Sequence, residues 1–169
     1  MDHAAVMKTI VESVVRLGIR NIQNDSDRGI RYLVDLGKQL SRTRLQQEFY
    51  QNVQQLLEKP GSAYRRLISS TVNRVDAKTL EVFGTNLGYM SWTYGARIIR
   101  HQESRRGYHI PWTLLLDCDA EPSVDLHQLV AEGQQSGIYT YMVLAGSHMR
   151  EAGRLPALFK AFPDSAFVV

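Results

Sequence analysis

Cysteine is almost absent from this chain of 169 residues, and the single thiol is that of Cys118. A lone cysteine has no intramolecular partner, so nothing suggests the disulfide framework common in oxidising compartments. A site that needs several thiolates from this chain is excluded for the same reason.

Long apolar runs are also missing. A membrane-spanning helix needs about 18 or more apolar residues, and the closest window, residues 80–99, contains Glu81 and Arg97. Residues 1–5 lack the basic-then-apolar pattern of a signal peptide. We therefore expect a cytoplasmic protein with no membrane partner.

Neither sign of charge is in large excess, since the formal net charge is +3. The arginines are spread along the chain without a basic tail, which does not favour nucleic acid as a partner. The densest basic group can meet phosphate, nucleic acid or an acidic protein, or it can be a solvated helix end where cations favour the dipole. This group consists of Arg97, Arg100, His101, Arg105 and Arg106.

What the chain does contain is helical periodicity over its first hundred residues. Apolar residues recur at the i, i+3, i+4, i+7 spacing of one helix face, and polar or Pro-Gly breaks interrupt them. Five helices are expected: residues 4–20, a second capped within residues 24–27, residues 41–58, a fourth capped by Ser62, and a fifth capped by Asp76 that runs through Met90.

The period changes after Tyr108. Residues 110–117, 138–144 and 166–169 have the apolar or β-branched composition of short buried strands, and helical patterns at 125–135 and 155–162 separate them. Strands that alternate with helices imply parallel pairing through right-handed crossovers. The sequence therefore predicts an α/β protein, with a helical region at residues 1–105 and a βαβαβ unit at residues 106–169. Its last strand presents an edge that favours either a homodimer or a chain cut from a longer one.

Three segments carry a resemblance to a known family. Residues 107–117 read G-Y-H-I-P-W-T-L-L-L-D, residues 137–148 form a strand ending in A-G-S-H, and residues 162–169 read F-P-D-S-A-F-V-V. They resemble the first three barrel strands in one subgroup of the radical S-adenosylmethionine domain family, where the first strand begins N-I-P-W-x-x-x-x-D. The helices before residue 106 are similar to those that precede that barrel. The resemblance implies a partial barrel scaffold.

The departures from the family pattern are as informative as the matches. In the family, a C-x-x-x-C-x-x-C loop after the first strand holds a 4Fe–4S cluster, whereas residues 118–123 here are short and hold one cysteine. The family's G-G-E-P turn, which holds the amino group of the cofactor, reads A-G-S-H at residues 145–148 and has no carboxylate. The resemblance therefore implies a degenerate relative, and we expect no resident cofactor and no metal.

The carboxyl ends of parallel strands are where such sheets bind ligands. Asp117 and Cys118 follow the first expected strand, and Ser147 and His148 follow the second. One alternative is a zinc site formed by Asp117, Cys118, Asp119 and His148, although no dense ligand spacing supports it. Another is that Cys118 and His148 form a nucleophile–base pair. The simpler alternative is that the acids cap the next helix and Cys118 is a small apolar residue.

An unusual glycine- and aromatic-rich segment lies at residues 84–95. Each glycine costs a helix about 1 kcal/mol relative to alanine, so several together suggest close approach of a backbone or a ligand. Either the aromatic rings line an apolar pocket, or the segment packs tightly against a helix or sheet. The candidate ligand-binding residues here are Gly84, Asn86, Gly88, Tyr89, Trp92 and Tyr94.

These observations predict a non-catalytic binding or regulatory protein. It would hold a small apolar or aromatic ligand, or a partner protein, near residues 84–95 and the strand ends, and act as a homodimer. One alternative is an enzyme that uses Cys118, His148 and nearby acids, with or without a metal. Another is the front of a larger radical enzyme with an altered cluster loop.

Overall fold

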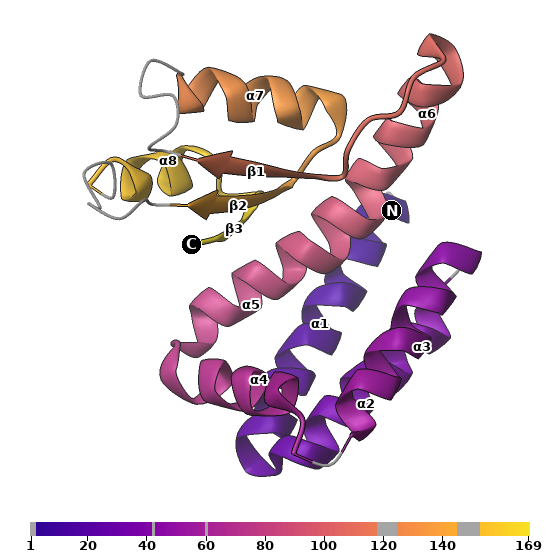
Figure 1. The fold of residues 1–169 in the computed structure, drawn as a ribbon, viewed down its shortest axis with the longest axis vertical. Helices are drawn as coiled ribbons and strands as arrows, with labels where there is room; N and C mark the ends of the chain where they lie inside the picture. Colours follow the sequence, from indigo (N-terminus) through magenta and orange to yellow (C-terminus); the bar gives the residue numbers. More distant parts are fainter. Residues whose placement is uncertain (1–2, 42, 60, 118–124, 145–152) are drawn as a thin grey trace. The chain divides into compact units, whose positions relative to one another are not determined.

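The computed structural model describes residues 3–41, 43–59, 61–117, 125–144 and 153–169 (Figure 1). The chain divides into two compact units, the first ending at Val82 and the second beginning at Phe83. In chain order the elements are α1 (His3–Asn24), α2 (Ser26–Leu40), α3 (Arg44–Glu58), α4 (Ala63–Arg74), α5 (Ala77–Thr85), η1 (Asn86–Gly95), α6 (Ala96–Arg106), β1 (Thr113–Asp117), α7 (Leu126–Ser136), β2 (Thr140–Leu144), α8 (Leu155–Ala161) and β3 (Ala166–Val168).

The first unit is helical, as its periodicity predicts. The Asp25 carboxylate accepts the Arg28 N–H at 3.1 Å and caps α2, and Thr43 with Gln46 forms a capping box at α3. Ser62 stands at the N-cap position of α4 as predicted, but its buried hydroxyl forms no hydrogen bond with a backbone N–H of that helix. The buried core of this unit comes from α1, α2, α3 and α4 and consists of Ile19, Ile22, Ile30, Val34, Leu57 and Val72.

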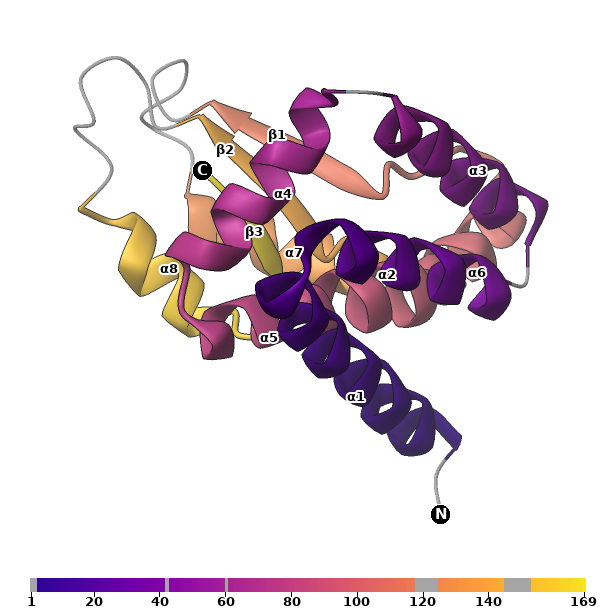
Figure 2. The same cartoon turned by 90° about the horizontal axis from the view of Figure 1, so that it is seen from below.

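The second unit contains a parallel sheet with strand order β1-β2-β3 (Figures 1 and 2). Asp125 caps α7 through the His127 N–H at 2.9 Å, and Gly137 ends it with a φ of 95° that favours glycine. The predicted three parallel strands and their two connecting helices are therefore confirmed. Helices α7 and α8 pack on one face of the sheet, around Leu116, Val130, Ile138, Tyr141, Val143, Leu155 and Leu158.

The fifth expected helix differs from its prediction. Asp76 caps it as expected, accepting the Thr79 N–H at 2.9 Å, but helical structure continues past Met90 to Arg106. Residues 86–95 form a π-helix, η1, between α5 and α6, and such wide turns are rare and are often found at functional sites. Residues 83–106 thus belong to the same compact unit as the strands. The boundary between the two compact units lies after Val82, whereas the sequence predicted a boundary between residues 105 and 106.

Gly95 explains why the π-helix can lie so close to the rest of its unit. A Cβ atom at this position would meet the Gly137 carbonyl oxygen. Backbone atoms cannot move aside as a flexible side chain can, so only glycine fits there. The glycine content of this segment therefore reflects, at least at Gly95, a close approach of two backbones.

Candidate functional site

One face of the sheet carries α7 and α8, and among the described residues of the second unit helix covers only one end of the opposite face. Side chains of a strand alternate between the two faces, and parallel sheets are ordinarily buried on both. The uncovered side of the sheet is therefore a candidate binding surface. Its residues form rungs across the strands: Thr113, Thr140 and Ala166, then Leu115, Met142 and Val168, then Asp117 and Leu144.

The π-helix η1 covers the first rung. The Thr140 hydroxyl donates to the Ser91 hydroxyl at 2.8 Å, and both side chains are buried. The Thr113 hydroxyl donates to the Thr140 carbonyl at 3.1 Å, and Ala166 has no exposed surface. This end of the face is closed and polar groups within it are bonded.

The remaining rungs are open. Leu115 is 63% exposed, Met142 48%, Leu144 49% and Val168 42%. We call these four side chains the open face. They are apolar and contiguous across three strands, and exposed Asp117 borders them at the carboxyl end of β1. Contiguous apolar surface of this kind marks an interaction site more often than scattered single side chains do.

The sequence-predicted residues of the glycine-rich segment lie in α5 and η1, where most of their contacts are structural. The buried Asn86 amide donates to the Pro163 carbonyl at 2.8 Å and to the Ser165 carbonyl at 3.0 Å. Tyr89 is buried, and Gly84 and Gly88 are half-buried. In two further contacts, the Trp92 ring lies 5.9 Å from that of Trp112 and the Tyr94 ring 5.9 Å from that of Tyr139.

The structure does not bring these residues together with Asp117, the strand-end candidate that it describes. The η1 segment lies against the amino-terminal rung, whereas Asp117 lies four residues further along β1, a separation of about 13 Å at 3.3 Å per residue. Cys118, Ser147 and His148 lie outside the described residues, so the enzyme alternative built on them stays a prediction.

Comparison with known proteins finds no matching family model, curated protein or solved structure. In the part of the chain that the structure describes, no helix has the length and apolar character needed to cross a membrane. Over the same residues, three or more His, Cys, Asp or Glu side chains nowhere cluster closely enough to hold a metal ion.

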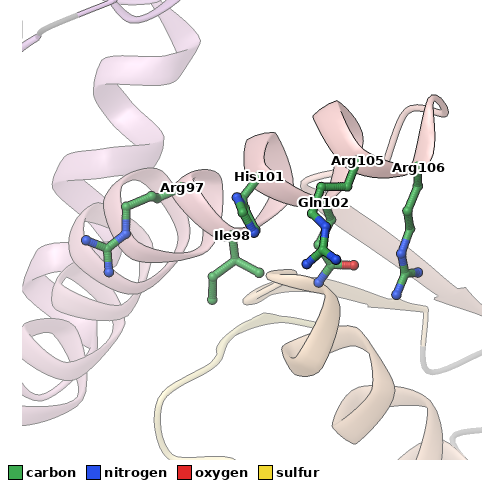
Figure 3. Close-up of a pocket in the computed structure, with 6 residues that line it drawn as sticks. All are labelled: Arg97, Ile98, His101, Gln102, Arg105 and Arg106. Atoms are coloured by element: carbon green, nitrogen blue, oxygen red, sulfur yellow. The ribbon is translucent and has the colours of Figure 1, made fainter.

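A second candidate site is a groove of about 730 Å³ along α6 (Figure 3). Residues four apart on a helix lie on one side of it, so the lining forms two adjacent stripes. Figure 3 shows Gln102, Arg105 and Arg106 extending from the same side of α6, with Arg97 pointing away at the other end. The first stripe is Arg97, His101 and Arg105, and the second is Ile98, Gln102 and Arg106.

The groove is basic and contains no carboxylate among its lining residues. The nearest acid in α6, Glu103, accepts the Ile110 N–H at 2.9 Å and contacts the His109 ring at 3.3 Å. The Ile110 N–H, followed by His109 and Arg100, lowers the pKa of Glu103. This carboxylate is therefore occupied in joining α6 to the segment that leads into β1, and it does not line the groove.

Two polar contacts fix the walls of the groove. The Gln102 amide donates to the Gln135 carbonyl of α7 at 2.9 Å, while its Oε1 is buried and has no partner within the described residues. Arg106 donates to the Tyr108 hydroxyl at 2.7 Å, and the Arg97 guanidinium lies 5.8 Å from the centre of the Tyr94 ring. The sequence shows the arginine cluster but gives no sign that Ile98 and Gln102 complete a concave surface.

Proposed function

We propose that the chain is a binding or regulatory protein whose second unit holds a small apolar or aromatic ligand, or a partner protein, on the open face. The observation that carries this proposal is the one-sided covering of the sheet. Leu115, Met142, Leu144 and Val168 form an apolar surface that a solvated parallel sheet does not ordinarily present.

The winding of the sheet supports a partial barrel as the scaffold. The strands follow one another in the order β1-β2-β3, and both connecting helices pack on the same face. Right-handed crossovers that always step in one direction place their helices on one side, as in a barrel. A doubly wound sheet reverses direction and covers both sides. In a barrel, the helix-free face is the interior, and ligands bind toward the carboxyl ends of its strands.

The residues present do not fit the cluster of the radical S-adenosylmethionine family. Three thiolates are needed for the family's cluster loop, and this chain contains one cysteine. We therefore propose a degenerate relative of that family that retained the scaffold for binding. A fold alone carries no function, so the proposal depends on the open face and its test.

The test replaces one side chain of the open face with a polar one. Leu115→Ser removes an apolar side chain that is 63% exposed, and Leu67→Ser on α4 removes one that is 64% exposed, so the two variants are matched in chemistry and exposure. We expect native mass spectrometry of the purified protein to show a bound small molecule or a second protein, and the Leu115→Ser variant to lose it.

The Leu67→Ser variant should retain the same bound mass as the unchanged protein. Binding of the fluorescent apolar probe anilinonaphthalene sulfonate should fall in Leu115→Ser and stay unchanged in Leu67→Ser. Equal behaviour of the two variants in both measurements, or a bare monomer that takes up no probe, would refute a binding role for the open face.

A further inference from the structure

The groove on α6 has a chemistry different from that of the open face. We infer that it binds a phosphorylated small molecule that also carries a hydrogen-bond donor, such as a sugar phosphate or a nucleotide. The inference rests on three properties of the groove: cations that form no ion pair with the described residues, their spacing along one helix, and a buried acceptor that has no partner among those residues.

The first property is the positive charge of the residues that line the groove. Arg97, Arg105 and Arg106 line the groove with His101, and none of them forms an ion pair within the described ranges. Arginine presents a planar fork of N–H donors that matches the oxygens of phosphate. A groove with three arginines and no carboxylate attracts an anion.

The spacing limits the size of that anion. Arg97, His101 and Arg105 follow one another at intervals of four residues, which is about 6 Å per step along a helix that rises 1.5 Å per residue. These three lining residues therefore span about 12 Å of the helix axis. That length and a volume of about 730 Å³ suit a small organic ligand. An extended nucleic acid strand needs a longer basic track.

The orphaned oxygen identifies a second feature of the ligand. The Gln102 Nε2 is held by the Gln135 carbonyl, which directs the orientation of the amide and leaves Oε1 as a buried acceptor. A buried acceptor without a donor is costly. A hydroxyl of a sugar or an amino group of a base supplies the missing donor, whereas the dianion of a phosphate monoester has no O–H to donate.

The experiment measures dissociation constants by isothermal titration calorimetry on the full chain. The probes, used at pH 8, are ribose 5-phosphate, adenosine monophosphate, methyl phosphate and a thymidine oligonucleotide, because the methyl phosphate dianion has no hydrogen-bond donor. We expect one of the first two to bind more tightly than methyl phosphate, with affinity that decreases as salt is added. Arg105→Gln should weaken this binding about tenfold because a charge-assisted contact is lost.

Arg100→Gln is the matched control. Arg100 is an exposed arginine on the same helix that does not line the groove, so its replacement should change the dissociation constant less than about twofold. Gln102→Met should reduce the preference for the sugar phosphate over methyl phosphate. This ratio of affinities does not depend on the fraction of protein that is folded.

Three results would overturn the inference. The first is that no phosphorylated probe binds at millimolar concentration. The second is that Arg100→Gln weakens binding as much as Arg105→Gln, which would mean that diffuse positive charge attracts the probe. The third is that the oligonucleotide binds far more tightly than the mononucleotide, which would indicate a nucleic-acid surface in place of a small-molecule groove.

Discussion

Replacing Asn86 with aspartate distinguishes a structural role for this side chain from a ligand-binding one. The change keeps the shape and leaves no cavity, but it exchanges the Nδ2 donor for an oxygen that faces the Pro163 and Ser165 carbonyls at 2.8 and 3.0 Å. Two hydrogen bonds of about 1 kcal/mol each are lost. Leaving an ionised carboxylate in a buried site against two carbonyls costs at least about 2 kcal/mol more. We therefore expect the free energy of unfolding to fall by about 4 kcal/mol near neutral pH.

The same variant has a predictable pH dependence. Burial against two carbonyls favours the protonated form of the new carboxyl, so its pKa in the folded state is raised above the value of about 3.9 in the unfolded chain. The folded state then binds the extra proton, and the stability of the variant relative to the unchanged protein increases as the pH falls toward about 4. A protonated carboxyl also donates one hydrogen bond, which restores about 1 kcal/mol.

Urea unfolding followed by tryptophan fluorescence measures this loss, because Trp92 and Trp112 are both in the second unit and lie 5.9 Å apart. The control is Asn52→Asp at an exposed position of α3, which should stay within about 0.5 kcal/mol of the unchanged protein. If Asn86→Asp is as stable as the control at neutral pH, the amide does not hold η1 to the segment before β3, and its role as a ligand contact is favoured instead.

Two further substitutions test the packing of the second unit by the same unfolding assay. Gly95→Ala would place a methyl group against the Gly137 carbonyl and should lower the free energy of unfolding by about 2–3 kcal/mol. In the control Gly153→Ala the new methyl group meets nothing within 4 Å, so the free energy of unfolding should change by less than about 0.5 kcal/mol. Equal losses in the two variants would refute the close approach of Gly95 to Gly137. Tyr141→Phe removes a buried hydroxyl whose one proton lies between the Ile138 carbonyl at 2.8 Å and the Val130 carbonyl at 3.2 Å, and it should cost about 1–2 kcal/mol. Burial raises the pKa of Tyr141, so the folded state keeps a proton that the unfolded chain loses above about pH 10. The free energy of unfolding therefore falls as the pH rises past that value. If Tyr141→Phe loses stability with rising pH as steeply as the unchanged protein does, the raised pKa does not belong to Tyr141.

Local signals explain why the parallel strands and their helices could be predicted. Asp125 and Gly137 mark the beginning and end of α7 through a side-chain cap and a positive φ, and both act over a few neighbouring residues. The alternation of strand and helix then fixes parallel pairing and the hand of the crossovers. None of these steps requires knowledge of a contact between distant segments.

The π-helix could not be predicted because it depends on contacts between residues that are far apart in the sequence. The π-helix is held by bonds such as Ser91 with Thr140 and by the approach of Gly95 to Gly137, and a sequence pattern does not show which residues meet. The open face was missed for another reason. A strand buried on both faces reads as a continuous apolar run, so Leu115 in the run of leucines of β1 looks as though it is buried.

The candidate site was predictable only in part, for the same reason. The arginines of α6 stand out in the sequence, but the groove also needs the Gln102 amide bonded to Gln135 in α7. The prediction that residues 84–95 and the strand ends form one site depended on the distance between these segments, and a sequence does not show that distance. Asn86 and Asp117 prove to be near opposite ends of the sheet.

The two proposed sites place opposite demands on what they bind. The four side chains of the open face are all apolar, so an occupant gains free energy there by removing apolar surface from water. The α6 groove offers three guanidinium groups and an amide oxygen without a partner among the described residues. An occupant gains free energy there by charge-assisted hydrogen bonds, which salt weakens, and by a neutral hydrogen bond to the amide oxygen. A single ligand group cannot satisfy both surfaces. A loss of probe binding in Leu115→Ser with normal phosphate affinity, or the reverse in Arg105→Gln, would therefore assign each activity to its own surface.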